Sequence, residues 1–135
     1  MSGFHIAERY FSNDESKPSV GLANIHAEIP DIEANKDKIL KAIEIFKERK
    51  VNIAIFPEFC LSGYFWEDEP ACWRYMDRAV IENHSAWIEN SVRAQIDDSF
   101  RGVILNNIRR GVDRKYYNST YVISKRHDYL KRDEI

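Results

Sequence analysis

An α/β fold is predicted by the order and character of the apolar segments near the start of the chain. Residues 19–26 alternate apolar with small or polar side chains, which is typical of a strand. Residues 31–50 place Ile39 and Ile43 at helical spacing, and basic side chains near the end of this segment favour the negative end of a helix dipole. Residues 51–56 form a short apolar run without charges, as a strand covered on both faces does. The predicted order is strand, helix, strand.

A second helix and a less regular segment are predicted in the middle of the chain. Apolar side chains recur at helical spacing over residues 84–98, with Asn83 or Ser85 available as the N-cap. Residues 64–82 combine several aromatic side chains with an acidic run, which suits a loop or a short helix beside a pocket.

Three strands are predicted to follow the second helix. They are expected at residues 102–108, 117–124 and 129–135, with a turn through Gly111 after the first and a hairpin at 125–128 after the second. Because no internal repeat or linker rich in Pro, Gly and Ser separates these elements, we expect a single domain.

The composition is that of an ordinary globular protein. A chain of 135 residues with 44% apolar content can bury roughly two-thirds of its unfolded surface. We expect a polar arm over residues 1–18 and one domain over residues 19–135. The net charge of −2 and the isoelectric point near 6.1 are not those of a nucleic-acid-binding protein, and no segment approaches membrane-spanning length. Without an apolar leader segment, we expect a cytoplasmic protein in which Cys60 and Cys72 stay reduced.

One carboxylate stands at the predicted end of the strand over residues 51–56. Pro57 fixes the backbone so that Glu58 is presented rigidly, and Gly63 permits the sharp bend that follows. Phe56, Phe59 and Tyr64 surround Glu58 in the sequence and are expected to exclude water, which would raise the pKa of the carboxyl and favour its use as a base. The alternative from composition alone is a capping or salt-bridged glutamate.

The sequence motif around Glu58 resembles that of a known family. "NIAIFPEFCLSGY" resembles the first catalytic segment of the nitrilase or carbon–nitrogen hydrolase superfamily, where an apolar strand leads into Phe-Pro-Glu and a Gly-Tyr pair. "VGLANIHAEIPDIEANKDKIL" and "RGVILNNIRRGVDRKYYNSTYVIS" are similar to other segments of that family, so the resemblance covers residues 19–124. It implies an α-β-β-α sandwich, of which this chain holds the N-terminal half.

The resemblance also implies a Glu-Lys-Cys triad in which Glu58 is the general base. A thiol with a pKa of about 8.5 is mostly protonated at neutral pH, so a nearby base accepts its proton as the sulfur attacks a nitrile or amide carbon. A lysine stabilises the tetrahedral intermediate, and no metal or organic cofactor is required. The family's cysteine belongs to a later segment, so we expect neither Cys60 nor Cys72 to be the nucleophile. Lys131 either is the triad lysine or is a strand-surface charge, with the triad lysine beyond Ile135.

Other residues are weaker candidates for a functional site. The four histidines (His5, His26, His84 and His127) make no metal-binding pair, and the basic cluster of Arg109, Arg110, Arg114 and Lys115 is interpreted as a solvated hairpin end rather than a nucleic-acid surface. Asn118 could orient a substrate or bond the neighbouring backbone. Tyr64 and Trp66 could line a pocket or pack in the core.

We therefore expect an amidase- or nitrilase-type hydrolase that cleaves a non-peptide C–N bond in a small amide, nitrile or carbamoyl compound through a cysteine thioester. The isolated chain is expected to be inactive. The alternative is a non-catalytic α/β binding or assembly module on the same scaffold. An uncovered sheet face would favour either a homo-oligomer or a complementary C-terminal half as partner, and we expect no nucleic acid and no membrane.

Overall fold

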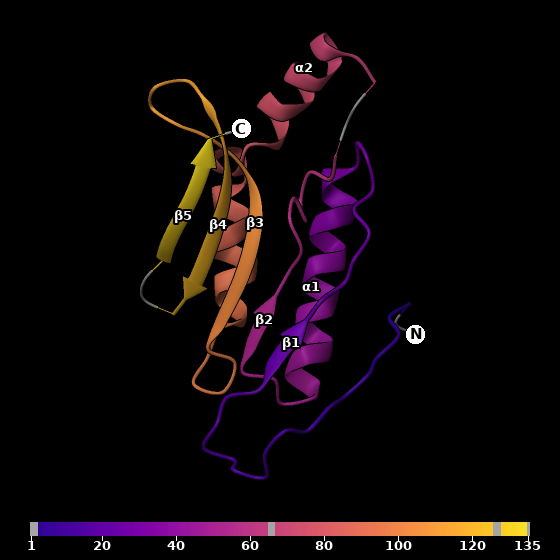
Figure 1. Cartoon of the computed structure of the whole chain (residues 1–135), viewed down its shortest axis with the longest axis vertical. Coiled ribbons are helices and arrows are strands. Elements are labelled where there is room, and N and C mark those ends of the chain that lie inside the picture. The colour runs from indigo at the N-terminus through magenta and orange to yellow at the C-terminus, as the bar shows by residue number, and fades with distance from the viewer. Residues whose placement is uncertain (1–2, 65–66, 126–127, 135) are drawn as a thin grey trace.

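The computed structural model describes residues 3–64, 67–125 and 128–134, and of the last 7 it describes the backbone. Its centre is a five-stranded sheet in the order β1-β2-β3-β4-β5 (Figure 1). The strands are β1 (Val20–Leu22), β2 (Ile53–Ile55), β3 (Gly102–Arg110), β4 (Tyr116–Ser124) and β5 (Asp128–Glu134). The first three are parallel and the last three form an antiparallel meander. The predicted α/β class is confirmed.

The first helix forms where the sequence predicts it. Helix α1 (Ile32–Glu48) begins after Asp31, whose side chain accepts a hydrogen bond from the Ala34 N–H (2.9 Å). Its buried stripe, which includes Ile39 and Ile43, packs on the sheet beside β1 and β2. The helix approaches β1 so closely that a Cβ on Gly21 would lie 2.5 Å from the ring of Phe46.

The middle of the chain is helical but less regular than the sequence predicts. Helix α2 (Glu69–Ala79) lies within the segment expected to be a loop or a short helix. The predicted helix over residues 84–98 is a run of four short pieces: η1 (Ile81–His84), α3 (Ser85–Trp87), the π-turn η2 (Ile88–Val92) and η3 (Arg93–Gln95). Neither predicted N-cap, Asn83 or Ser85, starts this run. It stops earlier than predicted because Asp97 accepts hydrogen bonds from the Ser99 and Phe100 N–H groups and folds the chain into a turn.

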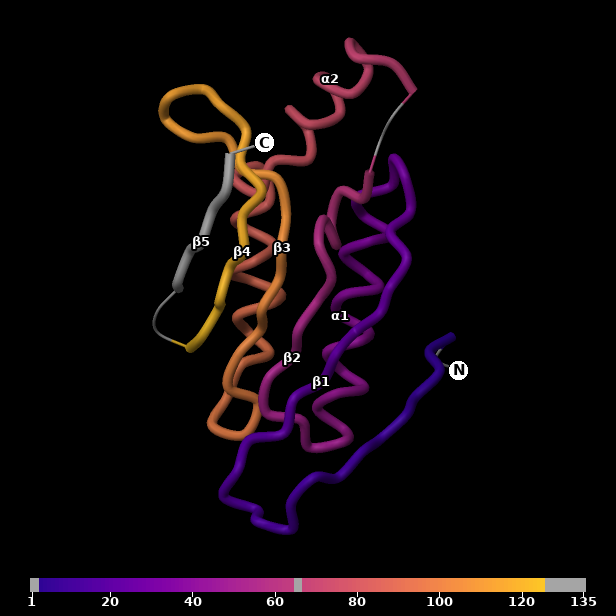
Figure 2. The backbone as a smooth tube through the Cα atoms, viewed as in Figure 1, coloured from indigo at the N-terminus to yellow at the C-terminus, as the bar shows by residue number. Residues whose placement is uncertain are grey.

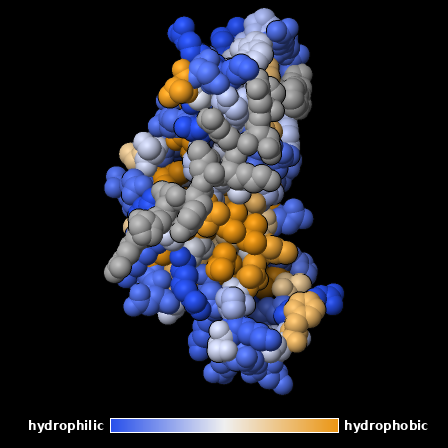
Figure 3. All heavy atoms as spheres, turned by 60° about the vertical axis from the view of Figure 1, so that its left-hand side comes forward, coloured by the Kyte–Doolittle hydropathy of each residue, from blue (hydrophilic) through white to orange (hydrophobic). Residues whose placement is uncertain are grey.

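Both helical layers lie on the same face of the sheet. Helix α1 covers β1 and β2, and the run from η1 to η3 covers β3 and β4 (Figure 1). On the opposite face, Val20 and Leu22 remain 50% and 74% exposed, and the neighbouring apolar residues Ile53, Ile55, Ile104 and Val122 are half-buried. Figure 3 shows apolar side chains gathered in one patch on the surface of the molecule. We call this surface the open sheet face.

The open sheet face corrects one prediction about β2. The apolar run over residues 51–56 was expected to be covered on both faces, but only Ala54 and Phe56 are buried, and Ile53 and Ile55 on the open sheet face are half-buried. The strand over residues 19–26 is also shorter than predicted, since regular pairing ends at Leu22 and the Ala23 N–H makes a last bond to Ile55 O (2.8 Å). A run of apolar residues does not by itself reveal whether the second covering layer belongs to the same segment of chain.

The ends of the chain lie outside this core. Residues 3–18 contain no helix or strand and pass the end of α1, where Arg49 Nη1 donates to Glu8 Oε1 at 2.6 Å (Figure 2). The hairpin predicted at residues 125–128 includes positions 126–127, which lie outside the described residues. Among the described residues, no helix has the length and apolar character needed to cross a bilayer.

Candidate active site

Glu58 lies three residues beyond the end of β2, at the edge of the sheet where this parallel strand terminates. It borders a hollow of about 400 Å³, which we call the Glu58 hollow. The other residues that line this hollow come from β2, β3 and β4: Ile55, Phe56, Ile104, Leu105, Asn106, Asn118 and Thr120. The sheet therefore presents one carboxylate beside a group of polar side chains.

Both oxygens of Glu58 accept a hydrogen bond from a neighbouring side chain. The Tyr64 hydroxyl donates to Oε2, and Asn118 Nδ2 donates to Oε1. The bond to the carboxylate, together with partial burial, raises the pKa of Tyr64 to about 12, so its phenol remains a donor throughout the neutral range. These two donors fix the plane of the carboxylate.

Asn118 is itself oriented by a second amide on the neighbouring strand. The Phe59 N–H donates to Asn106 Oδ1 at 2.9 Å, so the Asn106 amide nitrogen points away from the turn. That nitrogen donates to Asn118 Oδ1 (2.5 Å) and to Thr120 Oγ1 (3.1 Å). Because the Asn118 oxygen is an acceptor in this chain, its nitrogen must face Glu58. The Phe59 N–H therefore fixes the donor and acceptor of each hydrogen bond from Asn106 through Asn118 to Glu58.

The turn that carries Glu58 is also held from the helix-covered side. Asn107 accepts from the Ser62 N–H (3.1 Å) and donates to Ala79 O (2.7 Å), and Asn35 of α1 donates to Leu61 O (2.8 Å). Asn35 and Asn107 are fully buried. These amides satisfy backbone groups that no strand could pair, which keeps a non-repetitive turn in one conformation.

The bend expected at Gly63 is confirmed by its backbone conformation. Its φ of +65° lies in the left-handed region, and a Cβ there would lie 2.8 Å from Ile29. Phe59 also has a left-handed φ of +49°, which the sequence does not reveal because phenylalanine rarely adopts this conformation. The hydrogen bond from its N–H to Asn106 helps to hold Phe59 in place.

The solvation predicted for Glu58 is wrong for this chain. Glu58 is exposed, whereas Phe56 is buried and only 5% exposed. Phe59 and Tyr64 contact each other edge to face, with ring centroids 5.1 Å apart, rather than enclosing the carboxylate. Water reaches Glu58 from the open sheet face, which no described residue covers.

The two cysteines are free thiols in different parts of the fold. Cys60 is 1% exposed, and burial raises the pKa of its thiol to about 12. Its Sγ donates to Asn106 O at 3.4 Å, on the far side of the turn from solvent. Cys72 lies on α2, where its Sγ donates to Met76 Sδ at 3.7 Å. That neither thiol is the nucleophile stays a prediction.

Lys131 lies on β5, where its Cα is the register partner of Thr120. Thr120 lines the Glu58 hollow. The backbone position of Lys131 is therefore one strand away from the hollow, and its side chain lies outside the described part of the chain.

The basic cluster is largely neutralised by acidic neighbours. Arg109 Nε pairs with Glu82 (3.0 Å), and Arg110 Nη1 pairs with Asp77 (2.8 Å). Arg114 and Lys115 are exposed in the turn between β3 and β4. These contacts agree with a solvated hairpin end.

The described histidines do not meet at a metal site. His5 and His26 are exposed, and the His84 ring contacts Arg78 O at 3.0 Å, with burial lowering the pKa of His84. The described residues contain no group of three or more potential ligands for a metal ion. His127 and Trp66 lie outside the described residues.

Comparison with known proteins finds similarity to NAD(+) synthetases and to amidases. No family model matches the chain. A stretch of 47 residues is 49% identical to the glutamine-dependent NAD(+) synthetase of Aquifex aeolicus (strain VF5), which is 35% of this chain and 8% of that protein. The solved glutamine-dependent NAD(+) synthetase of Cytophaga hutchinsonii superposes with a TM-score of 0.64 at 24% identity, over 84% of this chain and 18% of that one.

Two amidase structures also superpose on this chain. NitN amidase from Neterenkonia sp. AN1 matches with a TM-score of 0.63 at 16% identity, over 85% of this chain and 44% of its own. An N-terminal amidase matches with a TM-score of 0.62 at 19% identity, over 83% and 27%. These neighbours all have nitrilase-like domains of the carbon–nitrogen hydrolase superfamily. The chain has the fold of the N-terminal part of a carbon–nitrogen hydrolase. It spans less than half the length of each of these relatives.

The carbon–nitrogen hydrolase fold accounts for the single sheet with helices on one face, and it confirms the resemblance inferred from "FPEFCLSGY". The sequence analysis missed Asn106 and did not predict that Asn118 and Tyr64 bond to Glu58, although Tyr64 lines a pocket as one of its alternatives stated. A signal was present, since two adjacent asparagines in "GVILNNIRR" are unusual in a strand and point to opposite faces of the sheet.

Proposed function

We propose that residues 19–135 are the N-terminal part of a carbon–nitrogen hydrolase domain, preceded by an arm over residues 1–18, and that Glu58 is its general base. The geometry of Glu58 carries the proposal. Its carboxylate follows a parallel strand, both of its oxygens are held by Tyr64 and Asn118, and it borders a hollow with room for a small ligand. A carboxylate held in this way keeps its shape when it accepts and returns a proton.

The reaction proceeds through a thioester. Glu58 accepts the proton of a cysteine thiol from outside this chain while the sulfur attacks the amide or nitrile carbon. For an amide, the proton passes to the departing nitrogen, and ammonia or an amine leaves as the thioester forms. Glu58 then accepts a proton from the water molecule that attacks the thioester, and the carboxylic acid product is released with the thiol restored.

A lysine stabilises the tetrahedral intermediates by placing an ammonium group beside the developing oxyanion. Lys131 is one candidate, because its backbone pairs with Thr120 of the Glu58 hollow. The other candidate is a lysine from the segment that supplies the cysteine.

The hydrolysis itself provides the test of this function. The chain, combined with the polypeptide segment that supplies the cysteine, is expected to release ammonia from simple amides, and the 135-residue chain alone is expected to release none. Ammonia is measured with a coupled glutamate dehydrogenase assay. Turnover by the isolated chain would contradict the proposal, and so would a folded, completed protein that hydrolyses neither amides nor nitriles.

The open sheet face is proposed to pack against the second β-layer of the hydrolase sandwich. It is apolar over β1, β2, β3 and β4, which suits a sheet partner, and soluble monomers seldom leave such a surface uncovered. Self-association through this face is the expected behaviour of the chain when the second layer is missing.

Leu22→Lys is expected to reduce both self-association and hydrophobic-dye binding of the isolated chain. Leu22 is 74% exposed on the open sheet face, so the lysine adds charge without removing core packing. The matched control is Val112→Lys, because Val112 is 102% exposed in the turn between β3 and β4, away from this face. Sedimentation velocity and dye fluorescence give the readout. Equal effects of the two substitutions, or a dye-silent monomeric parent, would contradict the assignment.

A further inference from the structure

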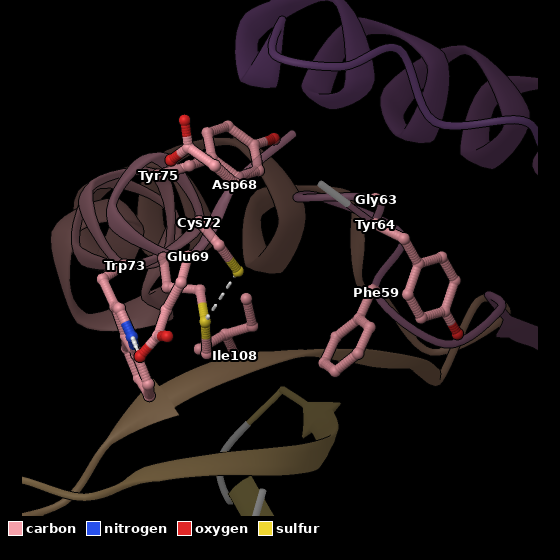
Figure 4. Close-up of a pocket in the computed structure, with 10 residues that line it drawn as sticks. Phe59, Gly63, Tyr64, Asp68, Glu69, Cys72, Trp73, Tyr75 and Ile108 are labelled. Carbon is pink, nitrogen blue, oxygen red and sulfur yellow. Dashed lines mark hydrogen bonds between the residues drawn. The ribbon is translucent and has the colours of Figure 1, made fainter. Parts of the chain in front are cut away.

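A second cavity, which we call the α2 pocket, lies between α2, β3 and the turn after β2 (Figure 4). Its volume is about 460 Å³. In Figure 4, Phe59 and Tyr64 lie on one side of the gap, and Cys72 and Trp73 of α2 lie on the other. Ile108 of β3 lies between them, and Met76 also lines the pocket. These walls are almost entirely apolar, and several of them are aromatic.

The charged groups at the rim of the α2 pocket have one sign. Asp68 and Glu69 are both exposed, and no lysine, arginine or histidine is found among the described residues that line the pocket. Asp68 accepts from the Ala71 N–H at 2.7 Å, and Glu69 accepts from Trp73 Nε1 at 3.2 Å. Each carboxylate has further lone pairs available. A negative rim over aromatic walls attracts cations and repels anions.

The α2 pocket adjoins the candidate active site through one pair of side chains. Tyr64 lines the pocket and also donates its hydroxyl to Glu58. Phe59 packs edge to face on Tyr64. Because Tyr64 contacts both the pocket and Glu58, we describe it, with Phe59 beside it, as the partition between them. A molecule with a reacting group at Glu58 and a short linker can therefore place a ring on the other side of this partition.

We propose that the α2 pocket binds an aromatic group that carries a positive charge or none, and that this group is part of the substrate whose C–N bond lies at Glu58. The preferred substrate class is therefore an arylalkyl amide or nitrile without a carboxylate. The second half of this proposal rests on the proposed hydrolase function. The binding of an aromatic group by the pocket does not.

Binding is measured with three probes that share a phenyl ring and a two-carbon spacer: 2-phenylethylammonium, 3-phenylpropanamide and 3-phenylpropionate. The chain has two methionines, Met1 and Met76, so ¹³C-methyl labelling gives Met76 its own NMR signal inside the pocket. The amide and the ammonium are expected to shift this signal saturably. The carboxylate is expected to bind more weakly by about fivefold, as suits repulsion by two exposed carboxylates.

Substitutions separate the contribution of the apolar walls from that of the rim. Cys72→Phe is expected to fill the pocket and abolish the Met76 shift, whereas Cys72→Ser keeps the volume and is expected to retain it. The double variant Asp68→Asn with Glu69→Gln is expected to remove the discrimination against 3-phenylpropionate. Asparagine caps a helix as well as aspartate does, and glutamine still offers Trp73 an acceptor, so the fold of α2 is preserved.

The outcomes distinguish this proposal from the function of Glu58. If no probe shifts Met76, or if Cys72→Phe leaves the shift intact, the pocket assignment is overturned while the role of Glu58 is untouched. Conversely, Glu58→Gln is expected to leave the shift caused by 2-phenylethylammonium unchanged. In the completed hydrolase, kcat/KM for 3-phenylpropanamide is expected to exceed that for propanamide, and Cys72→Phe to remove this advantage. Equal kcat/KM values for the two amides in the parent would refute the substrate class.

Discussion

Glu58→Gln is expected to lower the turnover of the completed hydrolase by at least about 100-fold, which is the loss typical of removing a general base. Glutamine has the shape of glutamate but does not accept a proton at neutral pH. Its amide oxygen can still accept from Asn118, and its amide nitrogen can donate to the Tyr64 oxygen, so both contacts of the carboxylate are retained. The loss should therefore appear in kcat rather than in stability.

Ammonia release and urea unfolding of the same protein samples provide the measurement. Glu44→Gln is the matched control, because Glu44 is an exposed carboxylate on α1, on the helix-covered side of the sheet. Turnover that survives Glu58→Gln rules out the assignment of the base. If the parent protein binds its partner but has no turnover to lose, the non-catalytic assembly module becomes the better account of the scaffold.

Asn107→Ala is expected to destabilise the fold by about 3 kcal/mol, because it leaves two buried backbone groups without partners. Asn107 is fully buried, and its amide is the described partner of the Ser62 N–H and of Ala79 O. Both of these residues are buried, so water cannot readily replace the lost bonds. Part of the cost is also the cavity that the shorter side chain leaves.

Urea unfolding followed by circular dichroism measures this effect, with Asn83→Ala as the control. Asn83 also donates to a backbone carbonyl, that of Asp77, but it is exposed and water can take its place. We expect the control to change the unfolding free energy by no more than about 0.5 kcal/mol. Similar losses in the two variants would show that the buried amide has no special role in holding the turn.

The sequence predicts the path of the chain better than the contacts of the site. Helix α1 and strands β3 and β4 follow from apolar periodicity, and the position of Glu58 follows from Pro57 and the end of an apolar run. Apolar periodicity predicted one continuous helix over residues 84–98, but this segment is a broken helix that contains a π-helical turn. Over so short a segment, α-helical, 3-10 and π-helical turns place apolar residues at nearly the same spacing, so the sequence does not distinguish them.

The partners of Glu58 were beyond prediction for a different reason. Tyr64 is close in sequence, but its direction depends on the left-handed backbone at Phe59 and Gly63. Asn118, 60 residues from Glu58, bonds its carboxylate, and Asn106, 48 residues from Glu58, bonds Asn118 and the Phe59 N–H. These contacts form only because β3 pairs with both β2 and β4. Long-range pairing of this kind has no local signature beyond the unusual presence of amides in a strand.

The sheet also has a consequence for the order in which the protein folds. Strands β1 and β2 with α1 form one unit of neighbouring sequence, and β3, β4 and β5 form another by hairpin contacts. The two units join where Ile53–Ile55 pairs with residues 102–104, which closes a loop over residues 56–101. Closing a long loop is slower than forming local contacts, so this seam is the late step. Asn106 and Asn107 reach across the same seam to the turn that carries Glu58, so the geometry around Glu58 forms only when the two units dock.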